Sequence, residues 1–391
     1  MSQRRRFVVV VALASVPVVF IVIWFATRGT DPPPVLPKGP TDSPKEIPKG
    51  ELPLPDGATW IRKAHPRKIV TTLFSQDGST IVSATESYHG LGAPAEVAVW
   101  HAKNGDKENA FKLEGNARPI SGIALSPDGK RLASSSGEKK VRLWNTQTGA
   151  ELTVLEHGQA VQTMAFSSDG KLASAVGYPE HWEVSTAEIV LWHVETAKVL
   201  GQIKYAPETP SDPKLPPLPF QKRQATMAVA FSQDCKTLAA LVSLHEDRVA
   251  INPPYEIEIW NGPGFEQRRR IAFLLGWTES LALSPDGTLV AVNHKQLLSK
   301  TGIRLFHINT EKEPVLFEGE FACLAFSRDS KWLAGASKTT VTIWDLASGK
   351  EIRSVPGNGE SITSMSFSPD KQQIVTGSAS GTIILWKLPS G

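Results

Sequence analysis

The chain has 391 residues, and its 42 Lys and Arg against 39 Asp and Glu give a formal net charge of +3, which gives no support to a nucleic-acid-binding function. Hydrophobic residues make up 41% of the chain, which is enough for a packed core and excludes wholesale disorder. The two cysteines cannot form a disulfide framework, and their spacing is not that of a zinc site.

The first feature along the chain is an uncharged apolar segment at residues 7–26, FVVVVALASVPVVFIVIWFA. A helix of this length is about 30 Å long, which matches the hydrocarbon core of a bilayer. Arg4, Arg5 and Arg6 stand directly before it, and positive residues stay on the cytoplasmic side. We expect residues 1–6 to be a basic cytoplasmic leader and residues 7–26 a transmembrane helix, a signal anchor in the cytoplasmic membrane with the rest of the chain outside.

A cleaved signal peptide is the alternative for this segment, and the protein would then be secreted. Signal peptides have an apolar region of about 7–15 residues and small residues at the cleavage site. Here Trp24 and Phe25 end the segment, and the one early Ala-x-Ala, Ala12 to Ala14, lies inside the apolar run. These features favour the uncleaved anchor.

Residues 27–57 contain nine prolines. Proline fixes φ and removes a backbone donor, so a chain rich in it is extended and semi-rigid rather than packed. We expect this segment to be a linker between the membrane and a folded domain at residues 58–391.

A Ser-x-Asp triplet recurs seven times in that domain, at residues 75–77, 126–128, 167–169, 232–234, 284–286, 327–329 and 368–370. Gly follows the Asp in four copies, and Pro lies between Ser and Asp in three. Pro presets φ at the second position of a turn and Gly accepts a positive φ, so each copy predicts a tight hairpin turn.

Short strands surround each turn. An apolar and small alternation precedes it, as in IALS at 123–126 and LAFS at 324–327, and a period of two indicates a strand. A second apolar run follows the turn, then a third strand that ends in an aromatic residue, then a fourth strand after a Gly-containing turn. The terminal aromatics are Trp100, Trp144, Trp192, Trp260, Phe306, Trp344 and Trp386.

This repeat resembles the WD-repeat family of β-propellers. The resemblance is carried by the turn SPDG, by the strand ends RLWN at 142–145 and TIWD at 342–345, and by a period near that of the family. It implies an all-β, seven-bladed β-propeller with four-stranded antiparallel blades and structural repeat aromatics. The regular turns and the short basic leader suggest a bacterial member of the family.

The last unit ends at Leu388, after its third strand, whereas residues 59–62 look like a fourth strand without a blade. We expect this N-terminal strand to complete blade seven, because closure removes exposed sheet edges. The family also has a His, Ser/Thr, Trp and Asp hydrogen-bond chain within a blade. By resemblance, His65–Ser83–Trp100 and His157–Ser174–Trp192 look like partial versions of it.

Family members, by resemblance, make most contacts on one rim, formed by the loops between strands two and three and the loops between blades. The insertions of this chain fall there, at residues 84–95, 177–187, 205–224, 243–255 and 293–302. Aromatic side chains give contact area with a polar handle. The candidate protein-binding residues are Tyr88, His89, Tyr178, His181, Trp182, His245 and Tyr255; the alternative is that they only pin their own loops.

An extracytoplasmic propeller enzyme, similar to a hydrolase or lactonase with a site at the channel mouth, is the alternative function. The four residues before each turn serine include no acidic, basic or histidine side chain in any unit. No Ser-His-Asp order, phosphate loop or metal-ligand spacing stands out. We therefore expect a membrane-anchored, non-catalytic scaffold for unidentified protein partners, with no cofactor, no metal and no nucleic acid.

Overall fold

The computed structural model describes residues 54–86, 94–116, 120–136, 139–176, 188–204, 225–243, 254–262, 264–295, 300–310, 312–357 and 359–388. The chain divides into two compact units, Met1–Pro48 and Lys49–Gly391, and every described residue belongs to the second. The predicted leader, transmembrane segment and most of the linker lie outside the described residues. Within the described ranges, no helix has the length and apolar character needed to cross a bilayer.

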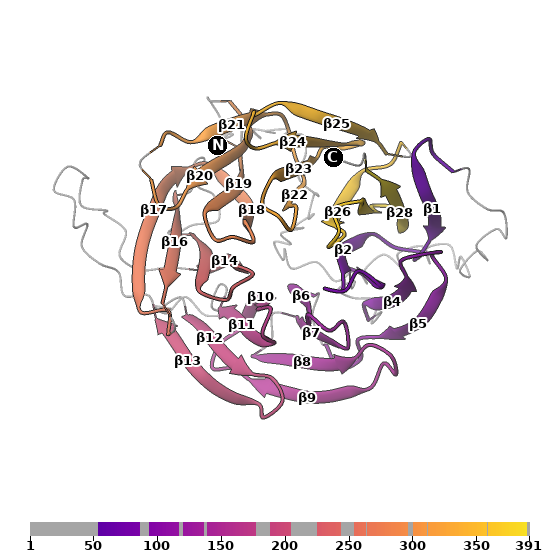
Figure 1. Cartoon of the computed structure of the whole chain (residues 1–391). Coiled ribbons are helices and arrows are strands. Elements are labelled where there is room, and N and C mark those ends of the chain that lie inside the picture. Colours follow the sequence, from indigo (N-terminus) through magenta and orange to yellow (C-terminus); the bar gives the residue numbers. More distant parts are fainter. Residues whose placement is uncertain are drawn as a thin grey trace, which may run out of the picture. The chain divides into compact units, whose positions relative to one another are not determined.

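Seven four-stranded antiparallel sheets, the blades, are arranged around a central axis (Figure 1). This confirms the predicted all-β seven-bladed propeller. Blades one to four are, from the inner to the outer strand, β2 (Ile69–Phe74), β3 (Thr80–Thr85), β4 (Glu96–His101), β5 (Lys107–Lys112); β6 (Gly122–Leu125), β7 (Arg131–Ser135), β8 (Lys140–Asn145), β9 (Glu151–Glu156); β10 (Val161–Phe166), β11 (Lys171–Val176), β12 (Glu188–His193), β13 (Lys198–Lys204); and β14 (Ala225–Phe231), β15 (Thr237–Ser243), β16 (Pro254–Asn261), β17 (Gln267–Leu275).

Blades five to seven follow the same order. They are β18 (Trp277–Leu283), β19 (Leu289–Lys295), β20 (Gly302–His307), β21 (Val315–Glu318); β22 (Cys323–Phe326), β23 (Trp332–Ala336), β24 (Thr340–Asp345), β25 (Glu351–Pro356); and β26 (Ile362–Phe367), β27 (Gln373–Ser378), β28 (Thr382–Lys387), β1 (Ala58–Lys63). The inner strands run toward the Ser-x-Asp turns, so all seven turns lie at one end of the central channel, which we call the hairpin end.

The hydrophobic core lies between the blades rather than inside any one of them. Seven clusters of buried residues occur among the described residues, and each combines side chains of two adjacent blades. The second strands, which consist mainly of aliphatic residues and small residues such as alanine and serine, are almost completely buried. The repeat aromatics of the third strands are also buried, at 0–8% exposure, which is the structural role the sequence predicts for them.

The first described strand closes the ring. β1 pairs antiparallel with β28, from Ala58 opposite Trp386 to Lys63 opposite Thr382, and the two strands lie side by side in Figure 1. Trp60 packs in the cluster between blades seven and one and donates its Nε1–H to the carbonyl of Ala102 at 2.9 Å. Ile61 packs in the cluster between blades six and seven. The predicted closure of blade seven by the N-terminal strand is therefore confirmed.

The predicted hydrogen-bond chain of blade one is also confirmed. The indole N–H of Trp100 donates to Ser83 Oγ at 3.0 Å, and His65 Nε2 lies 2.9 Å from the same oxygen. Burial, and then the charge of Lys107, lowers the pKa of His65 to about 4, so the ring is neutral at pH 7. Blades two and seven contain the same bond, from Trp144 to Ser134 and from Trp386 to Thr376.

The prediction for blade three is right for one bond and wrong for the other. Trp192 donates to Ser174 Oγ at 2.8 Å. His157, however, makes no side-chain hydrogen bond in the described part of the chain; both ring nitrogens are buried without a partner, and the ring packs at 6.1 Å and 56° to that of Trp192. Burial lowers the pKa of His157 to about 4. Here the histidine contributes packing rather than polar bracing.

Replacement by phenylalanine is expected to have opposite effects on the thermal midpoint at these two histidines. Because the pKa of His157 is about 4 in the folded state and about 6.5 in the unfolded state, the unfolded chain takes up its proton first. The contribution of His157 to stability is therefore full above pH 6.5 and is lost as the pH falls toward 4. His157→Phe removes this titration and two unpaired polar atoms, so we expect a thermal midpoint equal to or above that of the wild type at pH 7, and a smaller drop by pH 4.5.

His65→Phe is the matched control, because it removes the same ring type but breaks the bond to Ser83. We expect a lower thermal midpoint at pH 7, by an amount corresponding to about 1–3 kcal/mol, because the buried Ser83 hydroxyl loses its imidazole partner. A His157→Phe midpoint that falls as steeply with pH as the wild type, or a larger loss at pH 7 than in His65→Phe, would contradict this account.

Candidate functional site

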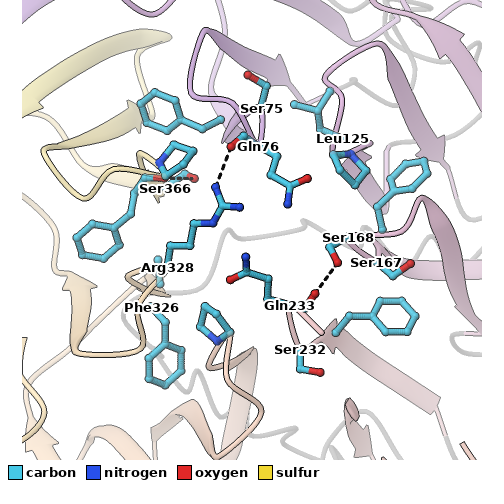
Figure 2. Close-up of a pocket in the computed structure, with 18 of the residues that line it drawn as sticks. Ser75, Gln76, Leu125, Ser167, Ser168, Ser232, Gln233, Phe326, Arg328 and Ser366 are labelled. Carbon is cyan, nitrogen blue, oxygen red and sulfur yellow. Dashed lines mark hydrogen bonds between the residues drawn. The ribbon is translucent and has the colours of Figure 1, made fainter. Parts of the chain in front are cut away.

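The channel opens at the hairpin end into a cavity of about 340 Å³. Every blade contributes to its lining, through the end of the inner strand and the turn that follows (Figure 2). Because the Ser-x-Asp turn ends all seven inner strands in the same way, equivalent residues of the repeat are placed as rings around the channel.

The first ring is apolar. It consists of the residue directly before each turn serine, which is Phe in five blades and Leu in two: Phe74, Leu125, Phe166, Phe231, Leu283, Phe326 and Phe367. Most of these side chains are only partly buried, with one part against the clusters between the blades and one part on the cavity. They give the cavity a mainly apolar wall.

The second ring consists of the middle residue of each Ser-x-Asp turn. Its members are Gln76, Pro127, Ser168, Gln233, Pro285, Arg328 and Pro369. Prolines suit this position because they preset φ at the second turn residue. Arg328 is the only charged side chain among the described residues that line the cavity.

The turn serines are fully engaged in their own turns. Each serine hydroxyl donates to the Asp two residues later at 2.5–2.7 Å, in all seven copies. The same oxygen accepts a backbone N–H from the start of the second strand, as from Thr80 to Ser75 at 3.0 Å. The hydroxyl of Ser75, followed by the backbone N–H of Ser79, holds the pKa of Asp77 below its usual value. These serines are turn-forming groups rather than free nucleophiles.

Arg328 extends from blade six across the mouth of the cavity (Figure 2). Its Nη1 donates to the main-chain carbonyl of Gln76 in blade one at 2.9 Å. With the amide of Gln233 oriented by its hydrogen bonding, the amide oxygen accepts from Nε and Nη2 of Arg328, both at 3.2 Å. The hydroxyl of Ser168 in blade three donates to the main-chain carbonyl of Gln233 at 2.5 Å. The Arg328 side chain of blade six thus bonds to blades one and four, and no two of these three blades are adjacent.

Two buried carboxylates, Glu256 and Glu258, lie in blade four. Glu258 accepts a bidentate pair of bonds from Arg268 at 2.6 and 2.9 Å, and Glu256 accepts from Arg270 at 2.6 Å. Burial raises the pKa of Glu256 against the lowering effect of Arg270. Each carboxylate has its own guanidinium on the neighbouring strand, so this group is a structural pair of ion pairs within one sheet.

The opposite end of the channel presents a large exposed aromatic. Trp277 is the first residue of β18, pairs in register with Lys295, and is 42% exposed. Lys295 Nζ lies 3.9 Å from a carboxylate oxygen of Glu320, at the start of blade six. This end is also the one to which the connections between strands two and three belong.

The structure places one of the seven candidate rim residues and leaves six outside the described residues. Those six are Tyr88, His89, Tyr178, His181, Trp182 and His245. The sequence predicts Tyr255 in a loop, and this prediction is wrong. Tyr255 lies in β16, between Ser243 and Leu274 of the neighbouring strands, and its side chain is 4% exposed. It packs in the core between blades four and five because β16 begins one residue earlier, at Pro254.

Sequence reasoning missed the cavity and Trp277. The signal for the cavity was present, since Phe or Leu precedes every turn serine and only one copy of the turn has a charged middle residue. Trp277 has no counterpart at the same position of the other repeats, so periodicity does not reveal it. Among the described residues, no group of three or more His, Cys, Asp or Glu could hold a metal ion.

Comparison with known proteins identifies the repeat. The WD domain, G-beta repeat family matches at residues 107–145, 316–345 and 349–387, so the chain contains WD40 repeats. Each matched segment takes the outer strand of one blade and the three inner strands of the next, for example β25 followed by β26 to β28. The repeat unit is therefore offset from the blade by one strand, which is the same offset that places β1 in blade seven.

Two relatives align with most of the chain. The Dictyostelium discoideum protein tipD is 22% identical over 86% of this chain and 50% of its own length, so this chain spans about half of it. A serine-threonine kinase receptor-associated protein of Dictyostelium discoideum is 25% identical over 84% of this chain and 98% of its own length.

A third relative aligns with a smaller part of the chain. The rice small ribosomal subunit protein RACK1y is 29% identical over 34% of this chain and 41% of its own length.

A solved structure supports the fold. The β-propeller domain of Myceliophteria thermophila Cps50 (Swd1) superposes with a TM-score of 0.60 and 16% identity, and covers 86% of this chain and all of that domain. The relatives named here are eukaryotic, so they give no support to a bacterial assignment.

Proposed function

We propose that this chain, in which WD40 repeats build a closed seven-bladed propeller, is a non-catalytic scaffold that binds protein partners and is held at a membrane by residues 7–26. The observation that carries the binding function is the exposed Trp277 at the end of the channel opposite the hairpin turns. The membrane part of the proposal rests on the apolar segment and on Arg4–Arg6.

Trp277 has the properties of a contact residue. It offers a large apolar surface with one indole N–H donor, and such side chains dominate the energetics of protein interfaces. It belongs to an inner strand whose backbone is fixed by pairing with β19, so its position is set before any partner binds. Lys295 and Glu320 give the adjoining surface a charge of each sign, as is usual at the polar edge of an interface.

The cavity at the hairpin end supports a non-catalytic role. Its described lining contains no carboxylate, histidine, cysteine or lysine side chain, so no group there can exchange a proton near pH 7. The turn serines in that lining donate to their turn aspartates, as in Ser75, Ser126 and Ser167, and the Ser168 and Ser366 hydroxyls donate to main-chain carbonyls. A hydrolase or lactonase needs a general base beside a nucleophile or a metal, and the described part of this mouth offers neither pair.

The binding face is tested by replacing Trp277 with alanine. Truncating an interface hot spot costs about 2 kcal/mol or more, about thirtyfold in affinity, whereas a 42% exposed side chain contributes less to folding than a buried one. We expect Trp277→Ala to lose capture of cross-linked protein partners from a membrane extract while its thermal midpoint stays near that of the wild type.

Trp332→Ala is the matched control, because Trp332 begins β23 at the hairpin end, where Lys371 lies 5.3 Å from its ring. We expect this variant to retain partner capture. Capture that survives Trp277→Ala and is lost in Trp332→Ala would place the binding face at the hairpin end instead.

The anchor is tested by adding protease to sealed, right-side-out membrane vesicles. With an N-terminus-inside anchor, the propeller is outside and we expect it to be digested without lysis. Protection until lysis would show the reverse orientation. A soluble form that begins near residue 28 would show that the apolar segment is a cleaved signal peptide.

A further inference from the structure

We propose that the cavity at the hairpin end is a binding site for a small organic carboxylate with an apolar body, whose carboxylate binds Arg328. This site lies at the opposite end of the channel from Trp277 and does not depend on the proposed scaffold function. Its ligand class follows from three properties of the described residues: the shape of the cavity, its apolar wall, and its single charge.

The shape fits a compact ligand. A volume of about 340 Å³ lies at the lower end of the range of small-molecule sites, about 300–1,000 Å³. All seven blades contribute to the wall, so the cavity is enclosed on its sides. A ligand therefore enters along the channel axis, from the hairpin end. A peptide lying across the mouth would contact only the outer ring of turn residues and would leave the apolar ring uncovered.

The wall fits an apolar body. The ring of five Phe and two Leu side chains surrounds the cavity, and several remain partly exposed to it. An aromatic or aliphatic group that fills this space removes those surfaces from water, at about 25 cal/mol per Å² buried. Aromatic rings in the wall also favour an aromatic ligand through edge-to-face contacts.

The charge fits an anion. A guanidinium has five N–H donors, and the bonds to Gln76 and Gln233 use three of them, which leaves two. The acceptors in those bonds are a main-chain carbonyl and a neutral amide, so they leave the positive charge uncompensated. No described carboxylate forms an ion pair with Arg328, and the adjacent Asp329 is paired with Lys371 Nζ at 2.6 Å. A guanidinium group that has free N–H donors and no carboxylate partner binds carboxylates strongly.

A purely structural role does not require this charge. The middle turn residue of the other six blades is uncharged, and Gln76 and Gln233 already hold their turns to the next blade through main-chain bonds to Pro127 and Pro285, at 3.0 and 2.7 Å. Arg328 is the one charged member of the ring, and it points across the mouth toward the other blades (Figure 2).

The test compares two probes that share an apolar body and differ in charge, phenylbutyrate and phenylbutylamine, in calorimetric titrations of the full-length chain. We expect phenylbutyrate to bind at least tenfold more tightly than phenylbutylamine, because the carboxylate gains charge-assisted bonds that the amine cannot form. Equal affinities, or tighter binding of the amine, would overturn the proposal. So would binding only of a peptide that ends in the same aromatic carboxylate, since this would assign the site to a protein terminus.

Arg328→Gln should reduce phenylbutyrate affinity about tenfold or more and abolish discrimination between the probes. Arg328→Lys keeps the charge but not the planar fork, and should give an intermediate affinity. Lys236→Gln is the matched control, because Lys236 is an exposed cation on the same face and is not part of the cavity wall. An equal loss in Lys236→Gln would show a diffuse effect of charge and overturn the proposal.

A measurement without variants covers the case in which Arg328→Gln does not fold. A photoreactive benzophenone carboxylate, added to the wild-type full-length chain, should label peptides that contain the cavity wall, such as those with Phe74, Phe231 or Phe326. Excess phenylbutyrate should suppress this labelling. Labelling confined to other parts of the chain would overturn the proposal.

Discussion

The pairing of β1 with β28 is the contact on which the rest of the structure depends. It joins residues 58–63 to residues 382–387, nearly the full length of the propeller apart in sequence. The core consists of clusters between neighbouring blades, and a ring of such clusters is continuous only if blade seven is complete. Trp60 and Ile61, adjacent on β1, enter the clusters on the two sides of that blade. The loop-closure entropy of this contact is offset by burial on both sides of the strand.

The site at the hairpin end is a consequence of the same regularity. A turn that ends each inner strand at the same residue places seven equivalent side chains in a ring, and the next turn position places seven more. The backbone of these rings repeats in every blade, so chemical specificity has to come from a position whose side chain differs in kind from the others. Arg328 is that position at the hairpin end, and Trp277 is its counterpart at the other end, where no other inner strand begins with an exposed tryptophan among the described residues.

The parts of the fold that depend on local pattern could be predicted from the sequence. The turns, the blade count, the closing strand and the Ser83–Trp100 bond each follow from residues at a fixed offset in a repeat. His157 shows where this reasoning ends: its offset matches that of His65, but in the folded blade its ring packs on Trp192 without reaching Ser174. Tyr255 shows the uncertainty of strand ends, because the two outer strands of blade four, β16 and β17, are eight and nine residues long, and β16 extends into what the sequence predicts as a loop. The cavity was not predicted because each lining residue, seen alone, is an ordinary strand end.

Hydrogen exchange of the full-length chain tests the closed ring most directly. If β1 is an integral strand of blade seven, the amides of residues 58–63 that bond to β28 should be protected to the same extent as the amides between β27 and β28, and both should exchange in one cooperative opening. Complete exchange of residues 58–63 at the earliest times, while residues 373–378 and 382–387 stay protected, would show that blade seven is stable without its N-terminal strand and would contradict the account.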